Sequence, residues 1–315
     1  MITVVIPTIG RPSLRATLAA LGPGIPVVVV DDRPAGAPLG ELPAGVRVVR
    51  SGGRGPAAAR NTGWRAAATP WVAFLDDDVV PGPGWAEAVR ADLAELPEDV
   101  AGSQGRIVVP LPRDRRPTDA ERHTAGLAGA HWPTADMAYR RSALERAGGF
   151  DERFPRAYRE DADLALRLWR AGFRLVKGRR VSVHPVRDDG FWASVRFQRG
   201  NADDARMRRR HGPGWRRAIG GGPTRLRRHA VTTALGVAAV AAVATRPLRT
   251  HRTPLTVAAA VAAAGWAAMT AEFAWARVRP GPRSAGEVLR MVVTSVAIPP
   301  AACAHRLQGE WRVRR

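Results

Sequence analysis

The 315-residue chain contains a single cysteine, Cys303, and a single lysine, Lys177. One cysteine excludes both a disulfide framework and a cysteine-based metal site within the chain, which agrees with a reducing, cytoplasmic setting. The opening stretch, "MITVVIPTIGRP", has no basic residues ahead of its short apolar run, so we expect no signal peptide there. The run is also too short to span a bilayer and is typical of a buried strand.

Acidic residues are few, and they are fewest in the C-terminal part of the chain. The chain has 49 basic and 28 acidic residues, a net charge of +21. Residues 1–200 hold 29 basic and 23 acidic residues, whereas residues 201–315 hold 20 and 5. This asymmetry indicates an anionic partner for the C-terminal part, either nucleic acid or an anionic membrane surface. A basic tail that binds DNA normally lacks long apolar stretches, and this tail has them, so the membrane surface is favoured.

Three uncharged stretches lie in this tail, at residues 230–245, 253–271 and 291–304. A spanning helix needs about 20 apolar residues; the second stretch approaches that length and the others are shorter. The sequence therefore predicts membrane association with one to three spans. A crossing at the first stretch would put the basic linker "RPLRTHR" outside, against the positive-inside tendency. Three possibilities stay open: the first stretch lies in the interface, it forms a tight re-entrant pair with the second, or the tendency is violated.

The first 100 residues alternate between strand and helix patterns. The runs "ITVVIPT", "IPVVVVDD" and "WVAFLDDD" indicate strands covered on both faces, and "RPSLRATLAAL" and "GPAAARNTGWRAAA" have helical spacing. Such alternation predicts an α/β fold, with a mostly parallel sheet and helices on both faces. Farther along, "EDADLALRLWRAGF" has the spacing of an amphipathic helix, and "RLVKGRRVSVHPV" indicates a last strand.

Acidic side chains gather at the ends of the predicted strands. Asp31 and Asp32 end one strand, and the triplet Asp76 to Asp78 ends another. Ligands of such sheets bind beyond the carboxyl ends of the strands, and crowded carboxylates need a compensating cation. The sequence therefore predicts a Mg²⁺ or Mn²⁺ site at this edge, with room for substrate phosphates. The alternative for the triplet is a solvated turn that caps a helix.

Two later features add candidate residues. Glu160, Asp161 and Asp163 begin the amphipathic helix, where acids favour the helix dipole. A carboxylate held at the mouth of a cleft can also act as a general base. His184 ends the last strand and is a candidate additional metal ligand.

Seven segments, in this order, resemble bacterial family 2 glycosyltransferases of the GT-A fold: "VVIPTIGRP", "VVVVDD", "GPAAARNTG", "FLDDD", "GGFDERF", "EDADLALRLWRAGF" and "VHPVR". The resemblance covers about residues 1 to 200. It implies inverting transfer of a sugar from a nucleotide-sugar donor to a hydroxyl acceptor. No "QxxRW" motif is present, which favours addition of a single sugar over polymerisation.

The resemblance also implies roles for residues on the nucleotide side. Thr8 and Asp32 match positions that hold the nucleotide base, Asp31 assists them, and Arg60 lies in a segment that often supports the nucleotide.

For the metal and the chemistry, the resemblance implies a second set of residues. Asp76 contacts the ribose or the metal, Asp78 and His184 bind the metal, and Asp77 is a spacer between the two outer acids. Asp161 is the general base.

The sequence assigns no role to three positions. At Asp136 many relatives carry a small or amide residue, so its contacts with donor or acceptor stay open. Trp192 and Gln198 either line the acceptor side or belong to a packed amphipathic helix.

We therefore expect a catalytic domain at residues 1–215 and a basic, alanine-rich, membrane-associated helical region at residues 216–315. The expected location is the cell membrane, with the catalytic domain on the cytoplasmic side. The expected partners are a nucleotide-sugar donor, a lipid-linked or cell-envelope glycan acceptor and anionic membrane lipid, but not nucleic acid. The alternatives are a catalytically inactive membrane scaffold of the same fold, a nucleotidyltransferase or a nucleic-acid-binding protein.

Overall fold

The computed structural model describes residues 1–244 and 254–314. They form two compact units, each built from separate stretches of chain. The sheet unit comprises Met1–Pro110, Thr124–Val186 and Arg217–Gly220, and the helical unit comprises Leu111–His123, Arg187–Arg216 and Gly221–Arg315. The predicted division at residue 215 stays a prediction. The basic linker "RPLRTHR" lies outside the described residues.

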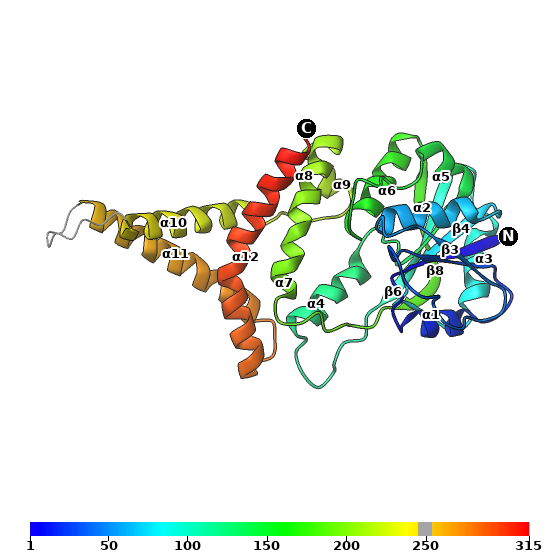
Figure 1. Ribbon diagram of the computed structural model, residues 1–315, viewed down its shortest axis with the longest axis horizontal. Coiled ribbons are helices and arrows are strands. Elements are labelled where there is room, and N and C mark those ends of the chain that lie inside the picture. Colours follow the sequence, from blue (N-terminus) through cyan, green and yellow to red (C-terminus); the bar gives the residue numbers. More distant parts are fainter. Residues whose placement is uncertain (245–253, 315) are drawn as a thin grey trace. The chain divides into compact units, whose positions relative to one another are not determined.

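The sheet unit contains an eight-stranded mixed sheet (Figure 1). Its strands are β1 (Ile2–Thr8), β2 (Val27–Asp31), β3 (Val46–Arg50), β4 (Trp71–Leu75), β5 (Val80–Pro81), β6 (Val100–Val108), β7 (Asp136–Arg140) and β8 (Arg174–Val183). Their order in the sheet is β3-β2-β1-β4-β7-β6-β8-β5. The first four in this order are parallel, as predicted. β7 runs antiparallel to β4 and β6, and β6 is parallel to β8.

Helices cover both faces of this sheet. They are α1 (Leu14–Leu21), α2 (Pro56–Ala66), α3 (Trp85–Ala94), α5 (Arg141–Ala147) and α6 (Glu160–Arg170), with the short η1 (Gly126–Gly129). Successive side chains of a strand point to opposite faces. Val5 of β1 accordingly belongs to one buried cluster with Leu164 of α6, and Val4 to another with Leu18 of α1. These clusters account for the uninterrupted apolar runs in the strand sequences.

The amphipathic pattern of α6 is confirmed. Leu164 and Leu168 are fully buried, and Trp169 packs against the same cluster. α2 lies very close to the sheet, because a Cβ atom added to Gly63 would come within 2.2 Å of Val5 Cγ1 and 2.9 Å of Val30 Cγ2. The glycine in "ARNTGW" therefore sets how near α2 approaches the strands that carry the acids.

The helical unit bears out the predicted helical, apolar C-terminal extension. Two segments, Thr256–Val278 and Ala285–Arg312, are long and apolar enough to cross a membrane. The remaining helices of the chain are α4 (Asp119–Ala125), α7 (Ala193–Arg196), η2 (Phe197–Arg199), α8 (Gly200–His211), α9 (Trp215–Ala218), α10 (Leu226–Ala244), α11 (Pro254–Val278) and α12 (Ala285–Arg312).

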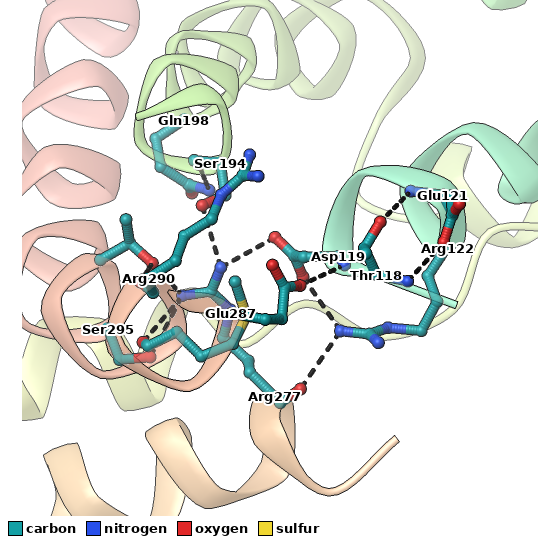
Figure 2. Close-up of polar contacts among 12 residues, drawn as sticks. Thr118, Asp119, Glu121, Arg122, Ser194, Gln198, Arg277, Glu287, Arg290 and Ser295 are labelled. Carbon is teal, nitrogen blue, oxygen red and sulfur yellow. Dashed lines mark hydrogen bonds and ion pairs between the residues drawn. The ribbon is translucent and has the colours of Figure 1, made fainter. Parts of the chain in front are cut away.

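A polar network joins four elements of the helical unit around Arg277, near the end of α11 (Figure 2). The Arg277 guanidinium donates to the carboxylate of Asp119 at 2.9 Å and to the hydroxyl groups of Ser194 at 2.9 Å and Thr294 at 2.7 Å. These partners belong to α4, α7 and α12, so one largely buried cation fixes the end of α11 against all three.

Candidate functional site

The carboxyl ends of three neighbouring strands carry the candidate site. Thr8 ends β1 and lies opposite Asp31 at the end of β2. β4 pairs with the other side of β1, and the acidic triplet begins at the residue after it. The parallel register therefore brings these ends to one edge of the sheet, as the sequence predicts.

Asp77 is the structural member of the triplet. Its carboxylate accepts hydrogen bonds from the Thr8 hydroxyl at 2.7 Å and from the Arg11 guanidinium at 2.9 Å. The Asp77 side chain is buried, so these two bonds tie the end of β1 to the turn after β4. Asp77, expected to be a spacer between Asp76 and Asp78, also anchors the turn through its side chain.

Asp78 faces His184 across the same edge. The distance from Asp78 Oδ1 to His184 Nε2 is 3.7 Å, and both side chains are largely buried. His184 is held by its backbone, whose N–H donates to the Val108 carbonyl at the end of β6. The Arg11 guanidinium lies 3.6 Å from the other Asp78 oxygen. Two of the three predicted metal ligands thus lie together.

Asp76 points to a different partner. Its carboxylate accepts a 2.8 Å hydrogen bond from Arg60, and the same guanidinium donates to Glu160 at 2.7 Å. The Arg60 side chain is 2% exposed and that of Asp76 is 30% exposed. Arg60, predicted on the nucleotide side, therefore connects the acidic triplet to the start of α6.

Asp161 follows Glu160 in the first turn of α6. Its carboxylate accepts a 2.6 Å hydrogen bond from the Ala162 backbone N–H. Burial raises the pKa of the Asp161 carboxyl group. Burial also raises the pKa of Glu160, to about 8; the charge of Arg60 opposes this rise and the neighbouring Asp161 adds to it. A carboxyl group with a raised pKa is suited to proton transfer near neutral pH.

The backbone just before these acids is strained. Arg159 has φ of 79°, in the left-handed region that non-glycine residues seldom adopt. Its guanidinium lies 4.2 Å from the Tyr158 ring centroid and donates to the Tyr158 hydroxyl. Strain of this kind persists where the surroundings fix a functional geometry, and here it sets the direction in which α6 begins.

Asp31 and Asp32 are held by different neighbours. Arg33 donates to both oxygens of Asp31, at 2.8 and 2.9 Å, and these hydrogen bonds lower the pKa of Asp31. Asp32 accepts from the Ser51 hydroxyl at 2.7 Å and from the backbone N–H of Gly55 at 3.0 Å. Gly55 precedes α2, so Asp32 fixes the start of the helix that carries Arg60.

Asp136, whose role the sequence leaves open, is a core residue. It is fully buried and accepts hydrogen bonds from Arg180 at 2.7 Å, Trp85 at 2.8 Å and Ser182 at 2.6 Å. The buried guanidinium of Arg180 compensates the charge of this carboxylate. Asp136 therefore has a structural role, because its hydrogen bonds join β7 to α3 and β8 within the sheet unit.

Trp192 and Gln198 belong to the helical unit. Trp192 is half exposed, and the Gln198 amide donates to the Ser194 carbonyl at 3.0 Å within its own turn. Sequence reasoning overlooked Arg11, although "TIGRP" places it just after a strand that ends at the candidate site. The rule that finds acids at strand ends would also have found this arginine.

Three or more metal-binding side chains do not gather at any one point in residues 1–244 and 254–314. Asp78 and His184 supply one carboxylate and one imidazole. Such a pair fits a divalent cation that takes its other ligands from phosphate oxygens and water.

Comparison with known proteins decides the family. The model of the family described as Glycosyl transferase family 2 matches residues 3–164, more than half of the chain. The chain belongs to glycosyl transferase family 2. This membership, together with the sheet and its flanking helices, confirms the predicted GT-A fold class.

Curated relatives in the family include the Pre-mycofactocin glycosyltransferase of two strains of Mycobacterium tuberculosis. Each is 34% identical over 194 residues, which cover 55% of this chain and 40% of the relative. The chain therefore spans well under half the length of these relatives.

Solved structures with a similar fold include GalNAc-T7 with UDP, GalNAc and Mn²⁺. It has a TM-score of 0.49 and 15% identity, and the match covers 70% of this chain and 56% of that one. S. aureus TarS has a TM-score of 0.43 and 14% identity, with 98% of this chain and 54% of that one covered.

Proposed function

We propose that this chain transfers a sugar from a nucleotide-sugar donor to a hydroxyl group of an acceptor, with inversion at the anomeric carbon. The observation that carries the proposal is the link from Asp76 through Arg60 to Glu160, with distances of 2.8 and 2.7 Å. This link connects the sheet edge proposed to hold the diphosphate with the helix start that carries Asp161. Family membership supports the same activity.

On the donor side, Thr8 and Asp32 would contact the nucleotide base, with Asp31 in support. A carboxylate has about four lone-pair sites. Asp32 uses one site on each oxygen, for Ser51 and Gly55, so it retains capacity to accept from the base ring. The two bonds also fix the direction of the remaining lone pairs.

Asp78 and His184 would hold a Mn²⁺ or Mg²⁺ ion, and the partly exposed Asp76 would contact that ion or the ribose. The bound cation neutralises the charge that develops on the leaving diphosphate. Arg11 is a second positive group at this edge, because its side chain is 38% exposed beside Asp77 and Asp78. It would contact a diphosphate oxygen.

Asp161 would act as the general base. Its carboxylate takes the proton from the acceptor hydroxyl while the hydroxyl oxygen forms a bond to the anomeric carbon. The bond from that carbon to the diphosphate oxygen breaks, and its electron pair leaves with the nucleoside diphosphate. Attack from the face opposite the leaving group inverts the anomeric centre. The raised pKa of Asp161 makes its carboxylate a stronger base than an ordinary aspartate.

The acceptor is proposed to be a lipid-linked or cell-envelope glycan, with the sheet unit on the cytoplasmic side of the membrane. The two apolar helical segments support a membrane location. A second candidate acceptor is pre-mycofactocin, since relatives 34% identical to this chain are named for it. The alternative of an inactive scaffold predicts no turnover with any donor.

The test is a panel of nucleotide-sugars incubated with the full chain and Mn²⁺, with release of nucleoside diphosphate as the readout. We expect turnover with one donor, and loss of that turnover in Asp78→Ala. Glu87→Ala, an exposed acid on α3, is the matched control and should leave turnover unchanged. The absence of turnover with every donor, together with the absence of a thermal shift with any nucleoside diphosphate plus Mn²⁺, would favour the inactive scaffold.

A further inference from the structure

The helices α10 and α11 form a hairpin that leaves an apolar surface uncovered. The two lie side by side (Figure 1) and pack through small residues. A Cβ atom on Gly236 would come within 2.9 Å of the Trp266 ring, and one on Gly265 within 3.1 Å of Leu235. Close packing of this kind uses the inner faces of both helices. The outer faces of both helices therefore do not take part in this packing.

The outer faces are apolar and exposed. The exposed large side chains on α10 and α11 include six valines: Val231, Val237, Val240, Val243, Val257 and Val261. No charged residue occurs from Ala230 to Ala244 or from Pro254 to Ala271. At 1.5 Å per residue these stretches extend about 22 and 27 Å, most of the roughly 30 Å of a bilayer's hydrocarbon core. An exposed apolar surface of this extent is unusual in water.

The base of the same hairpin is charged and aromatic. Arg225 and Arg228 both pair with Glu272, and Trp275 is exposed one turn farther along α11. Arginine and tryptophan are the residues that lie at the headgroup level of a membrane. The hairpin therefore has a charged and aromatic base, formed by Arg225, Arg228, Glu272 and Trp275, and an apolar shaft, formed by residues 230–244 and 254–271. This order matches the headgroup layer of one leaflet followed by the hydrocarbon core.

α12 has the apolar composition of a spanning helix but different surroundings. Its uncharged part, residues 291–304, is about 21 Å long at 1.5 Å per residue, close to the length of the uncharged stretch of α10, and it contains Pro299 and Pro300. A Cβ atom on Gly309 would meet the Ala202 backbone at 2.5 Å. α12 therefore packs tightly against α8, a helix rich in arginine. Backbone contact with such a helix is incompatible with lipid around that part of α12.

α12 is also fixed near its other end, and it contacts both helices of the hairpin. Arg290 donates to the Gly190 carbonyl, and Thr294 accepts from Arg277 in the network of Figure 2. Toward α10, the Cys303 sulfur lies 3.7 Å from the Thr233 hydroxyl, one turn after the base. These ties place α12 against the polar base and the first turn of the apolar shaft, and Val237, Val240 and Val243 farther along α10 stay exposed.

From this arrangement we infer that the α10–α11 hairpin is the element that enters an anionic lipid bilayer, and that α12 is a strut that stays outside the hydrocarbon. Both ends of the hairpin then lie on the side of the membrane that holds the rest of the helical unit. This assigns the membrane contact to α10 and α11, although composition alone selects α11 and α12.

The test is flotation of the full chain with vesicles of phosphatidylcholine and phosphatidylglycerol. Val240→Asp puts a charge on the hairpin shaft, and Leu307→Asp puts one on α12; the two side chains are matched at 70% and 71% exposed. A charge in the hydrocarbon weakens insertion by roughly a hundredfold. We expect that loss for Val240→Asp, with Leu307→Asp floating like the unmodified chain. Both substitutions replace exposed residues, so circular dichroism should show equal helix content.

Three outcomes would overturn the inference: the unmodified chain does not float, Val240→Asp floats as well as the unmodified chain, or Leu307→Asp loses flotation. A second measurement uses the Cys303→Ser background with a single cysteine at Val261 or at Leu289, followed by a fluorophore and lipid-borne quenchers. Strong quenching at Val261→Cys and none at Leu289→Cys is expected. Equal quenching at both positions would show that α12 is also embedded.

Discussion

The sheet unit contains two clusters of arginine and acids that differ in how completely they are satisfied. Around Arg180, the guanidinium donates to Asp136, Asp92 and both the hydroxyl and carbonyl of Ser103, and no part of the side chain is exposed. Around Arg60, among the residues that the structure describes, the guanidinium donates to two side chains, Asp76 and Glu160. Within the same described residues, neither Arg60 Nε nor Glu160 Oε2 has a hydrogen-bond partner.

The two clusters differ in how many of their polar atoms are hydrogen-bonded, and this difference indicates a different role for each. A buried charge network that satisfies every donor stabilises one geometry and has nothing left to offer a ligand. The Arg60 cluster keeps an exposed carboxylate and two buried atoms without partners, so part of its bonding capacity is unused in the protein alone. The same residue types thus build a structural centre in one place and a candidate active site in the other.

The largest expected effect is the loss of turnover when the proposed general base, Asp161, is replaced. Asp161→Asn removes the proposed general base while keeping the size of the side chain. Turnover should fall by about a hundredfold to ten-thousandfold, with no loss in the free energy of unfolding, because a buried carboxyl group is replaced by a neutral amide. The measurement is nucleoside diphosphate release alongside urea unfolding. Unchanged turnover would remove Asp161 from the chemistry.

The next effect is on stability and compares the two clusters directly. Asp136→Ala leaves Arg180 with a buried charge and should lower the free energy of unfolding by about 3–5 kcal/mol. Asp76→Ala removes a partner that is 30% exposed, so water can enter the space it leaves, and the loss should be smaller than for Asp136→Ala, although turnover should be impaired. Urea denaturation followed by tryptophan fluorescence measures both. Equal losses of stability would mean that the two clusters do not differ as argued.

A smaller effect tests whether the Arg60 cluster depends on the packing of its helix. In Gly63→Ala the new methyl group would overlap Val5 on the sheet, which should cost about 1–3 kcal/mol and reduce turnover by displacing Arg60. Gly126→Ala is the matched control, because a Cβ atom there has no neighbour within 4 Å. If both variants unfold at the same urea concentration, α2 is not held as closely as the structure indicates.

A further effect concerns the pH dependence of stability. The pKa of Glu160 is raised by burial from 4.5 to about 8 in the folded chain. The folded state then retains a proton that the unfolded chain releases, so this group makes the free energy of unfolding fall as pH rises between those two values. Glu160→Gln should flatten that decline, and the exposed Glu152→Gln should not. Unfolding curves at several pH values between 5 and 8 give the slopes, and parallel slopes would contradict the shift.

Much of the fold could be predicted from the sequence because its signals are local. Runs such as "VVVV" before Asp31 and "WVAFL" before Asp76 identify buried parallel strands, and each strand end directs its acids to the same edge. The spacing of Leu164 and Leu168 predicts the buried side of α6. The antiparallel insertion of β7 between β4 and β6 was not predicted, because strand order depends on pairing between segments far apart in the chain.

The candidate site was predicted as a set of residues but not as a set of contacts. Nothing in "LDDDVV" distinguishes Asp77, which binds Thr8 and Arg11, from Asp78, which faces His184. The membrane helices show the same limit. Hydropathy selects α12 rather than α10, because it does not register which helix packs alongside.

By itself, the sequence determined that acids from separate strands meet at one sheet edge and that the C-terminal part is basic and apolar, because both follow from periodicity and composition. Only the tertiary structure decided which acid anchors the turn, which faces His184 and which binds Arg60. Those pairings join residues about 16 to 106 positions apart, such as Asp76 with Arg60 and Asp78 with His184. Bonds over such separations depend on how the strands and helices pack, which no local pattern encodes.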